Sequence, residues 1–160
     1  MDKADRILKH REYHINLEKN CEAEAKRCFC HHDMVHFLDV ARIGWILNLE
    51  QNAGIRKELL YGAALLHDIG KHRQYLEGIP HEIASAEIAE KILRDCGFSE
   101  EENSMICDAI RSHRDASVKE EKSLRGILYR ADKLSRACFA CPAEAECNWT
   151  AEKKNLRLEV

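Results

Sequence analysis

The sequence has 160 residues, the size of a single domain that can bury one hydrophobic core without disulfides. Its 25 basic and 28 acidic side chains give a net charge of −3, so we expect no general binding to duplex nucleic acid or to an anionic membrane. No stretch approaches the roughly 20 apolar residues of a membrane-spanning helix, and the N-terminus M-D-K-A-D-R lacks the apolar block of a secretory signal, so we expect a cytoplasmic protein.

The first half of the chain predicts helices almost throughout, because helical periodicity is strong and strand signals are nearly absent. Residues 3–27 mix apolar and charged side chains and predict one or two surface helices. Residues 34–49 are apolar around most of the helix circumference, which indicates a central, largely buried helix. The next helix is predicted from about Ile55 to His67, with Gly70 well placed to end it.

The second half continues in the same way after a polar crossover that contains Gly78 and Pro80. Three further helices are predicted, over about 81–97, 99–113 and 120–136. Ser99 followed by Glu102 predicts a capping box at the start of the middle one. A short terminal helix is expected after Trp149. The sequence therefore predicts an all-α protein, an irregular helical bundle of about six to eight helices, with one domain over 1–160, a core at about 30–136 and a cysteine-containing extension at 137–160.

Several histidines and acidic residues are candidate metal ligands, although each could also be an ordinary helix residue. His36 lies in the most apolar helix, where an imidazole needs a partner; a hydrogen-bonded core histidine is the alternative. His67 and Asp68 end an apolar helix, and a neutral imidazole beside a carboxylate offers two ligands for a first-row metal. A charge patch at a helix end is the alternative for this pair.

Three more residues extend the pattern. Asp132 lies beside an apolar stripe, although a salt bridge to Arg136 four residues later is the simpler explanation. His81 opens a helix and His113 closes one, where it could also complement the helix dipole. One metal site that uses all these residues is a simpler explanation than five separate coincidences. Four imidazoles with two carboxylates suit Fe, Mn, Zn or Co better than Mg.

Three segments give the sequence a resemblance to the HD-domain metal-dependent phosphohydrolase superfamily. They are H-F-L-D-V-A at 36–41, L-L-H-D-I-G-K at 65–71 and Y-R-A-D-K at 129–133. The resemblance covers about residues 30–136 in the order of the family, and it places the first ligand at His36 rather than at His31 or His32.

The histidines that follow H-D-I-G-K, in H-E-I-A-S-A-E-I-A and I-R-S-H, resemble the branch of this superfamily that binds two metals. The resemblance implies one metal at His36, His67, Asp68 and Asp132, and a second at His81, His113 and a bridging Asp68. Cyclic-di-GMP phosphodiesterases continue with paired histidines and G-Y-P. Here Arg114 replaces the second histidine and G-Y-P is absent, so that substrate is not expected. Bacterial diadenosine tetraphosphate hydrolases share the order His, His-Asp, His, His, Asp.

The resemblance implies a metal-dependent phosphohydrolase that cleaves a phosphoester or phosphoanhydride bond of a nucleotide or another small phosphorylated metabolite by metal-activated water. Asp68 and Lys71 are the predicted catalytic residues, and the candidates for phosphate contact are Lys71, Arg114, Arg130 and Lys133, unless these are only solvated or paired with local acids. Two alternatives are a single-metal deoxynucleoside monophosphate phosphatase and a non-catalytic HD-fold sensor that binds a ligand or partner. A monomer and a homodimer both stay open.

The cysteines raise a separate question. Eight cysteines in a chain with only two prolines and seven glycines do not fit a loop-rich disulfide scaffold, so we expect reduced thiols. Three or four thiolates could form a structural zinc or iron–sulfur site, drawn from Cys138-x2-Cys141-x5-Cys147 and Cys28-x-Cys30. Small buried hydrophobes are the alternative, and this is the expectation for Cys21, Cys96 and Cys107.

Overall fold

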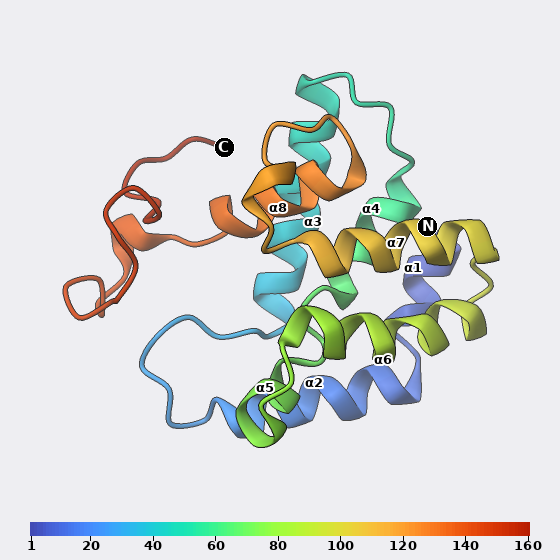
Figure 1. Ribbon diagram of the computed structural model, residues 1–160, viewed down its shortest axis with the longest axis horizontal. Helices are drawn as coiled ribbons and strands as arrows, with labels where there is room; N and C mark the ends of the chain where they lie inside the picture. The colour runs from blue at the N-terminus through green and yellow to red at the C-terminus, as the bar shows by residue number, and fades with distance from the viewer.

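The structure is a computed structural model that describes all 160 residues, and it contains helices and no strand, which confirms the all-α class. The α-helices are α1 (Asp2–Ile7), α2 (Arg11–Ala23), α3 (Met34–Glu50), α4 (Lys57–Leu66), α5 (Lys71–Glu77), α6 (His81–Asp95), α7 (Glu100–Ser112) and α8 (Leu124–Leu134). Two short 3-10 helices are η1 (Ala116–Val118) and η2 (Cys138–Ala140). Figure 1 shows the α-helices packed as an irregular bundle, with the C-terminal segment, in red, to one side of it. None of the helices is both long and apolar enough to span a membrane.

The centre of the bundle is α4 rather than α3. Seven of the ten residues of α4 are buried, and this helix contacts α1, α3, α6, α7 and α8. The helix α3 buries seven of its 17 residues and exposes Val35, Ile46 and Leu49, so the prediction that it is largely buried is only partly right. The side chains that close the core include Phe37, Leu60 and Leu65. Because α4 is surrounded by other helices, the residues that directly follow it, His67 and Asp68, lie in the interior of the bundle.

Side-chain caps define the starts of α3, α7 and α8, whereas α4, α5 and α6 start without one. The predicted capping box is present: the Ser99 hydroxyl accepts from the Glu102 amide, and the Glu102 carboxylate accepts from the Ser99 amide. Asp33 caps α3 by accepting from the amide of His36, and Ser123 caps α8. These local bonds satisfy amides that a helix start leaves free, and they set the first turn of α3 and α8.

Two predictions of local structure were wrong. The expected crossover after Gly70 contains the helix α5, which ends at Gly78 with φ +71°. Most of its residues are polar but are good helix formers. The helix was not predicted because the segment has few apolar residues to show a helical period. No helix follows Trp149, where the chain forms turns, bends and irregular structure. A short helix needs an apolar face to pack, and residues 137–160 bury only Cys138 and Ala143.

Candidate metal centre

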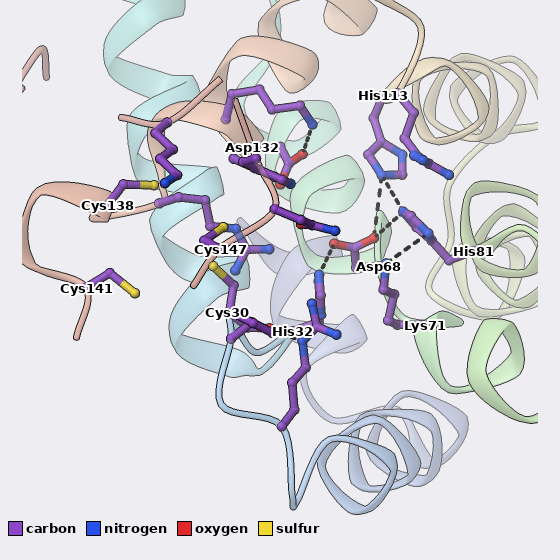
Figure 2. A pocket seen from close by; sticks show the side chains of 18 of the residues that line it. Cys30, His32, Asp68, Lys71, His81, His113, Asp132, Cys138, Cys141 and Cys147 are labelled. Atoms are coloured by element: carbon purple, nitrogen blue, oxygen red, sulfur yellow. Dashed lines mark hydrogen bonds and ion pairs between the residues drawn. The ribbon is translucent and has the colours of Figure 1, made fainter. Parts of the chain in front are cut away.

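Two groups of buried histidines and aspartates meet at Asp68. The first group contains His36, His67, Asp68 and Asp132, and the second contains Asp68, His81 and His113. Within each group, one ligand atom from every residue lies within 4.8 Å of all the others. The structure thus brings together all six residues that the sequence analysis singled out as ligands, from α3, α6, α8 and the ends of α4 and α7. Figure 2 shows four of them, Asp68, His81, His113 and Asp132.

The two carboxylate oxygens of Asp68 face different groups. Oδ2 lies 3.1 Å from His67 Nε2 and 3.6 Å from His36 Nε2. Oδ1 lies 3.1 Å from His81 Nε2 and 3.5 Å from His113 Nε2. Asp68 is 2% exposed, and Oδ1 accepts no hydrogen bond. A buried carboxylate oxygen without a donor is costly, and its position between two imidazoles fits a bridging metal ligand.

A tight turn places Asp68 at this point. The helix α4 ends at Leu66, and residues 67–70 form a turn that leads into α5. Gly70 packs directly on the backbone of α6, where an added Cβ would lie 2.6 Å from the amide nitrogen of Ser85. The Gly70 amide donates to the Ser85 hydroxyl over 2.9 Å. Glycine is therefore required for the close approach that brings the turn to the helix carrying His81.

The ring nitrogens of His67 and His113 that face the site are the ones free to bind metal. His67 Nδ1 donates to the carbonyl of Ala64 over 2.7 Å, and His113 Nδ1 donates to the carbonyl of Ile110 over 2.6 Å. Their Nε2 atoms each lie 3.2 Å from the Nε2 of a second histidine, His36 and His81 respectively. Two unprotonated nitrogens at this distance repel each other unless a proton or a cation lies between them. Both pairs therefore fit a bound cation.

The other two histidines also have outer partners. His36 Nδ1 lies 3.2 Å from the hydroxyl of Ser135, whose proton goes to the carbonyl of Asp132, so the imidazole is the donor. His81 Nδ1 lies 2.5 Å from Gln74 Oε1, which accepts its proton. Metal-binding histidines usually donate their second nitrogen in this way, which orients the ring and makes it a better ligand.

Asp132 completes the first group. Its Oδ1 lies 3.4 Å from His36 Nε2, and its Oδ2 pairs with Lys133 Nζ at 2.5 Å. The salt bridge to Arg136 that was the simpler alternative is not formed. The Arg136 guanidinium donates to the carbonyl of His31 and to His36 Nε2, each over 3.0 Å. A guanidinium bound to His36 Nε2 shows that this nitrogen presents a lone pair to the site.

The charges in the centre are strongly coupled. Burial alone would raise the pKa of Asp68, but His67 and His32 hold it well below its usual range. Burial would lower the pKa of His67, but the carboxylates of Asp68 and Asp132 raise it to about 10. Burial lowers the pKa of His81 to about 3, so this imidazole is neutral. The first group therefore holds a proton that a metal would displace, and His81 in the second offers a free lone pair.

His32 is the main residue of the site that sequence reasoning missed. Its Nε2 lies 3.7 Å from Asp68 Oδ2, and its Nδ1 lies 2.5 Å from Glu24 Oε1. Glu24 also accepts from the hydroxyl of Tyr75 over 2.7 Å. His32 precedes α3 in an irregular segment, where periodicity gives no orientation. The only available signal was its spacing of one helical turn before His36.

A cavity of about 200 Å³ opens onto the two groups. Its basic lining residues are Arg27, Lys71, Arg114, Lys133, Arg136 and Lys154, and its acidic ones are Asp68, Asp132 and Glu144. This excess of positive charge favours an anionic ligand. Lys71 is the first residue of α5, and its Nζ lies 3.1 Å from His81 Nδ1.

Arg130, a predicted phosphate contact, does not line this cavity. Its guanidinium donates to the carbonyls of Lys119 and Glu121 and to Gln51 Oε1. Arg130 therefore joins the loop before α8 to the end of α3.

All eight cysteines are free. Cys96 and Cys107 are buried as expected, whereas Cys21 is exposed, so its predicted burial was wrong. Cys138, Cys141 and Cys147 line the cavity of the metal centre, and Cys30 lines it with them.

Comparison with known proteins agrees with this geometry. The HD domain family model matches residues 34–137. An uncharacterized protein of Clostridium beijerinckii is 47% identical over 158 residues, which cover 99% of each chain. Ribonuclease Y of Enterococcus faecalis is 32% identical over 121 residues, which cover 76% of this chain and 21% of the ribonuclease. A crystal structure described as a predicted HD superfamily hydrolase, from an uncultured Thermotogales bacterium, superposes with a TM-score of 0.62 at 27% identity, covering 89% of this chain and 81% of that one.

Proposed function

The chain belongs to the HD domain family, and we propose that this HD superfamily hydrolase is a phosphohydrolase that uses two divalent metal ions. The proposed substrate is a nucleotide or another small phosphorylated metabolite, cleaved at a phosphoester or phosphoanhydride bond. The observation that carries the proposal is Asp68, a buried carboxylate whose two oxygens each face a separate group of histidines.

The ligands follow from the two groups. We assign the first metal to His36, His67, Asp68 and Asp132, and the second to Asp68, His81 and His113. Imidazole with carboxylate suits Fe, Mn, Zn or Co better than Mg, which prefers oxygen. A divalent metal bound here supplies an activated water at neutral pH and positive charge for a phosphoryl oxygen.

The remaining residues of the cavity bind and orient the substrate in this proposal. Lys71, Arg114 and Lys133 line the cavity and place cations where a phosphate would enter. Lys71 is only 9% exposed, and burial lowers its pKa. Because water screens this ammonium poorly, its attraction to a bound anion is strong. Asp68 bridges the two ligand groups and fixes their separation. The proposed catalytic residues are therefore Asp68 and Lys71.

Three alternative functions compete with this proposal: a single-metal phosphatase, a non-catalytic sensor and a ribonuclease. A single-metal deoxynucleoside monophosphate phosphatase needs only the first group of ligands, and the buried, unbonded Asp68 Oδ1 in the second group argues for two metals. A non-catalytic sensor has no need of all six ligands. The similarity to a ribonuclease makes single-stranded RNA a further substrate to test.

The test is a titration of metal-free protein with Mn²⁺ or Fe²⁺, using a phosphodiester reporter, a nucleotide panel and single-stranded RNA. We expect maximal hydrolysis at two metals per chain. His67→Ala and Asp132→Ala should abolish hydrolysis, and His81→Ala should lose only the second metal. His14→Ala, an exposed histidine outside the site, is the matched control.

Each alternative has its own outcome. Saturation at one metal per chain with deoxynucleoside monophosphates supports the single-metal phosphatase. Metal binding without hydrolysis of any substrate supports the sensor. Full activity in both His67→Ala and Asp132→Ala rules out the proposed centre.

A further inference from the structure

Four of the eight cysteines line the cavity beside the histidine–aspartate groups, and they come from two distant parts of the chain. They are Cys30, Cys138, Cys141 and Cys147. The other four do not line it: Cys21 and Cys28 are exposed, and Cys96 and Cys107 are buried elsewhere. Figure 2 shows the four lining cysteines together on one side, with Asp68, His81 and His113 on the other.

The backbone around the C-terminal cysteines forms consecutive turns. The amide of Cys141 donates to the carbonyl of Cys138 over 3.2 Å, at the end of η2. The amide of Glu144 donates to the carbonyl of Cys141, and that of Cys147 to the carbonyl of Glu144. A Cys-x2-Cys turn of this kind directs two thiols to one side, as in zinc and iron–sulfur sites.

The segment 137–160 has little else to hold it in place. It buries only Cys138 and Ala143. Its hydrogen bonds include one from Asn155 Nδ2 to the carbonyl of Leu134 at 2.9 Å and one from the amide of Phe139 to the carbonyl of Asn155 at 3.0 Å. A segment with so small a core needs a further source of folding free energy, and thiolate–metal bonds supply one in small domains.

A cation lies close to the C-terminal cysteines Cys138 and Cys147. The ammonium of Lys154 lies 2.7 Å from Glu144 Oε1, and its side chain is only 11% exposed. The pKa of Lys154 is raised chiefly by that hydrogen bond and also by the nearby Cys147 and Cys138. Arg136 lines the same cavity. Cations at this position would balance the negative charge of a metal centre bound by thiolates.

We propose that Cys30, Cys138, Cys141 and Cys147 ligate an iron–sulfur cluster that fastens segment 137–160 to the helical bundle. No three of these sulfur atoms lie within 4.8 Å of one another. A single tetrahedral zinc with Zn–S bonds of about 2.3 Å draws its sulfurs closer together than that. A cluster of several iron atoms joins thiolates that are farther apart. The cavity would then hold two kinds of metal centre, since imidazole and carboxylate select harder ions than thiolate does.

The experiment compares cysteine variants of the full chain, purified without oxygen. Iron, zinc and acid-labile sulfide are measured per chain, together with visible absorption before and after dithionite. We expect sulfide and a bleachable absorption in the wild type and in Cys28→Ser, and their loss in Cys30→Ser and Cys147→Ser. Cys28 is the matched control, because it is exposed and lies two residues from Cys30.

A second measurement does not depend on the folding of the variants. Native wild-type protein is alkylated and the modified cysteines are mapped by mass spectrometry. Cys21 and Cys28 should react at once, and the four proposed ligands only after the metal is removed. Alkylation of Cys30 and Cys147 as fast as Cys28 in the untreated protein overturns the proposal.

The remaining outcomes are also decisive. Equal iron and sulfide in Cys30→Ser and Cys28→Ser overturns the site. One zinc per chain that is lost in Cys30→Ser supports the four-thiolate site and overturns the iron–sulfur cluster. The Asp68→Asn variant should keep the sulfide and the absorption, so a failure of the proposed hydrolase centre is distinguishable from a failure of this site.

Discussion

Two buried carboxylates in this molecule, Glu102 and Asp68, have opposite surroundings. Glu102 accepts from Lys3 Nζ over 2.6 Å, from the amide of Ser99 over 2.8 Å, and from the guanidinium of Arg56. Asp68 faces imidazoles and leaves Oδ1 without a donor. The first carboxylate has all the partners that it needs within the chain, and the second keeps one buried oxygen without a donor. A buried acid with incomplete partners marks a site, and one with complete partners marks a structural junction.

The two positions should therefore respond differently to substitution. Glu102 joins the N-terminal helix α1 and the start of α4 to α7, so its loss should affect stability. Asp68 lies between histidines of both ligand groups, so its loss should affect metal binding and hydrolysis. The variants below test this contrast.

The largest effect is expected for Asp68→Asn. Both ligand groups lose their shared carboxylate, so kcat/KM with Mn²⁺ should fall by about a thousandfold or more. Thermal unfolding should be measured with and without Mn²⁺. Metal at 100 times its Kd should stabilise the wild type by about 2.7 kcal/mol and leave the variant unchanged. Activity within tenfold of the wild type would contradict a bridging function.

A smaller effect is expected from the residues behind the histidines. Gln74→Ala removes the acceptor of His81 Nδ1, and Ser135→Ala removes that of His36 Nδ1. Outer partners of this kind typically change metal affinity by about 10–100-fold. Competition titrations should show the second metal weakened in Gln74→Ala and the first in Ser135→Ala, so each variant is the control for the other. Equal weakening of both metals in both variants would argue against two separate groups.

Glu102→Gln should change stability and leave hydrolysis intact. Removing a charged acceptor from hydrogen bonds costs about 1–3 kcal/mol, which urea denaturation should detect as a lower midpoint. Glu101→Gln is the matched control, because this neighbour on the same helix is exposed. The kcat/KM of Glu102→Gln should equal that of the wild type. A loss of metal affinity in this variant would remove the distinction between the two carboxylates.

The parts of the site that the sequence predicted are those with a local signal. The capping box at Ser99 and Glu102 depends on residues three apart, and the structure contains it. His36 was conspicuous because it lies in an apolar helix, and His67 because it ends one. In each case one stretch of helix already shows that a polar residue is directed inward.

What the sequence did not predict depends on how distant segments meet. His32 reaches Asp68 from an irregular segment that has no period. The contact of Gln74 with His81 was not predicted, because the polar sequence of α5 gave no sign of a helix there. Arg130 was predicted to bind phosphate, and the loop path before α8 instead gives it two carbonyl partners. Periodicity identifies an inward face, but the partner across the bundle depends on the loops.

The smallest effect concerns pH. Hydrogen bonds from Lys3 and from the Ser99 amide lower the pKa of Glu102 to about 2, against an ordinary value of 4.5. Ionised Glu102 therefore stabilises the folded state fully above about pH 4.5, and this contribution is lost as the pH falls through about 2. The difference in unfolding free energy between wild type and Glu102→Gln should be constant near neutral pH and shrink across this acidic range. Urea midpoints of both proteins across a pH series measure it. A difference that persists undiminished at pH 2 would mean that Glu102 acts through packing, because most of its electrostatic contribution is lost by then.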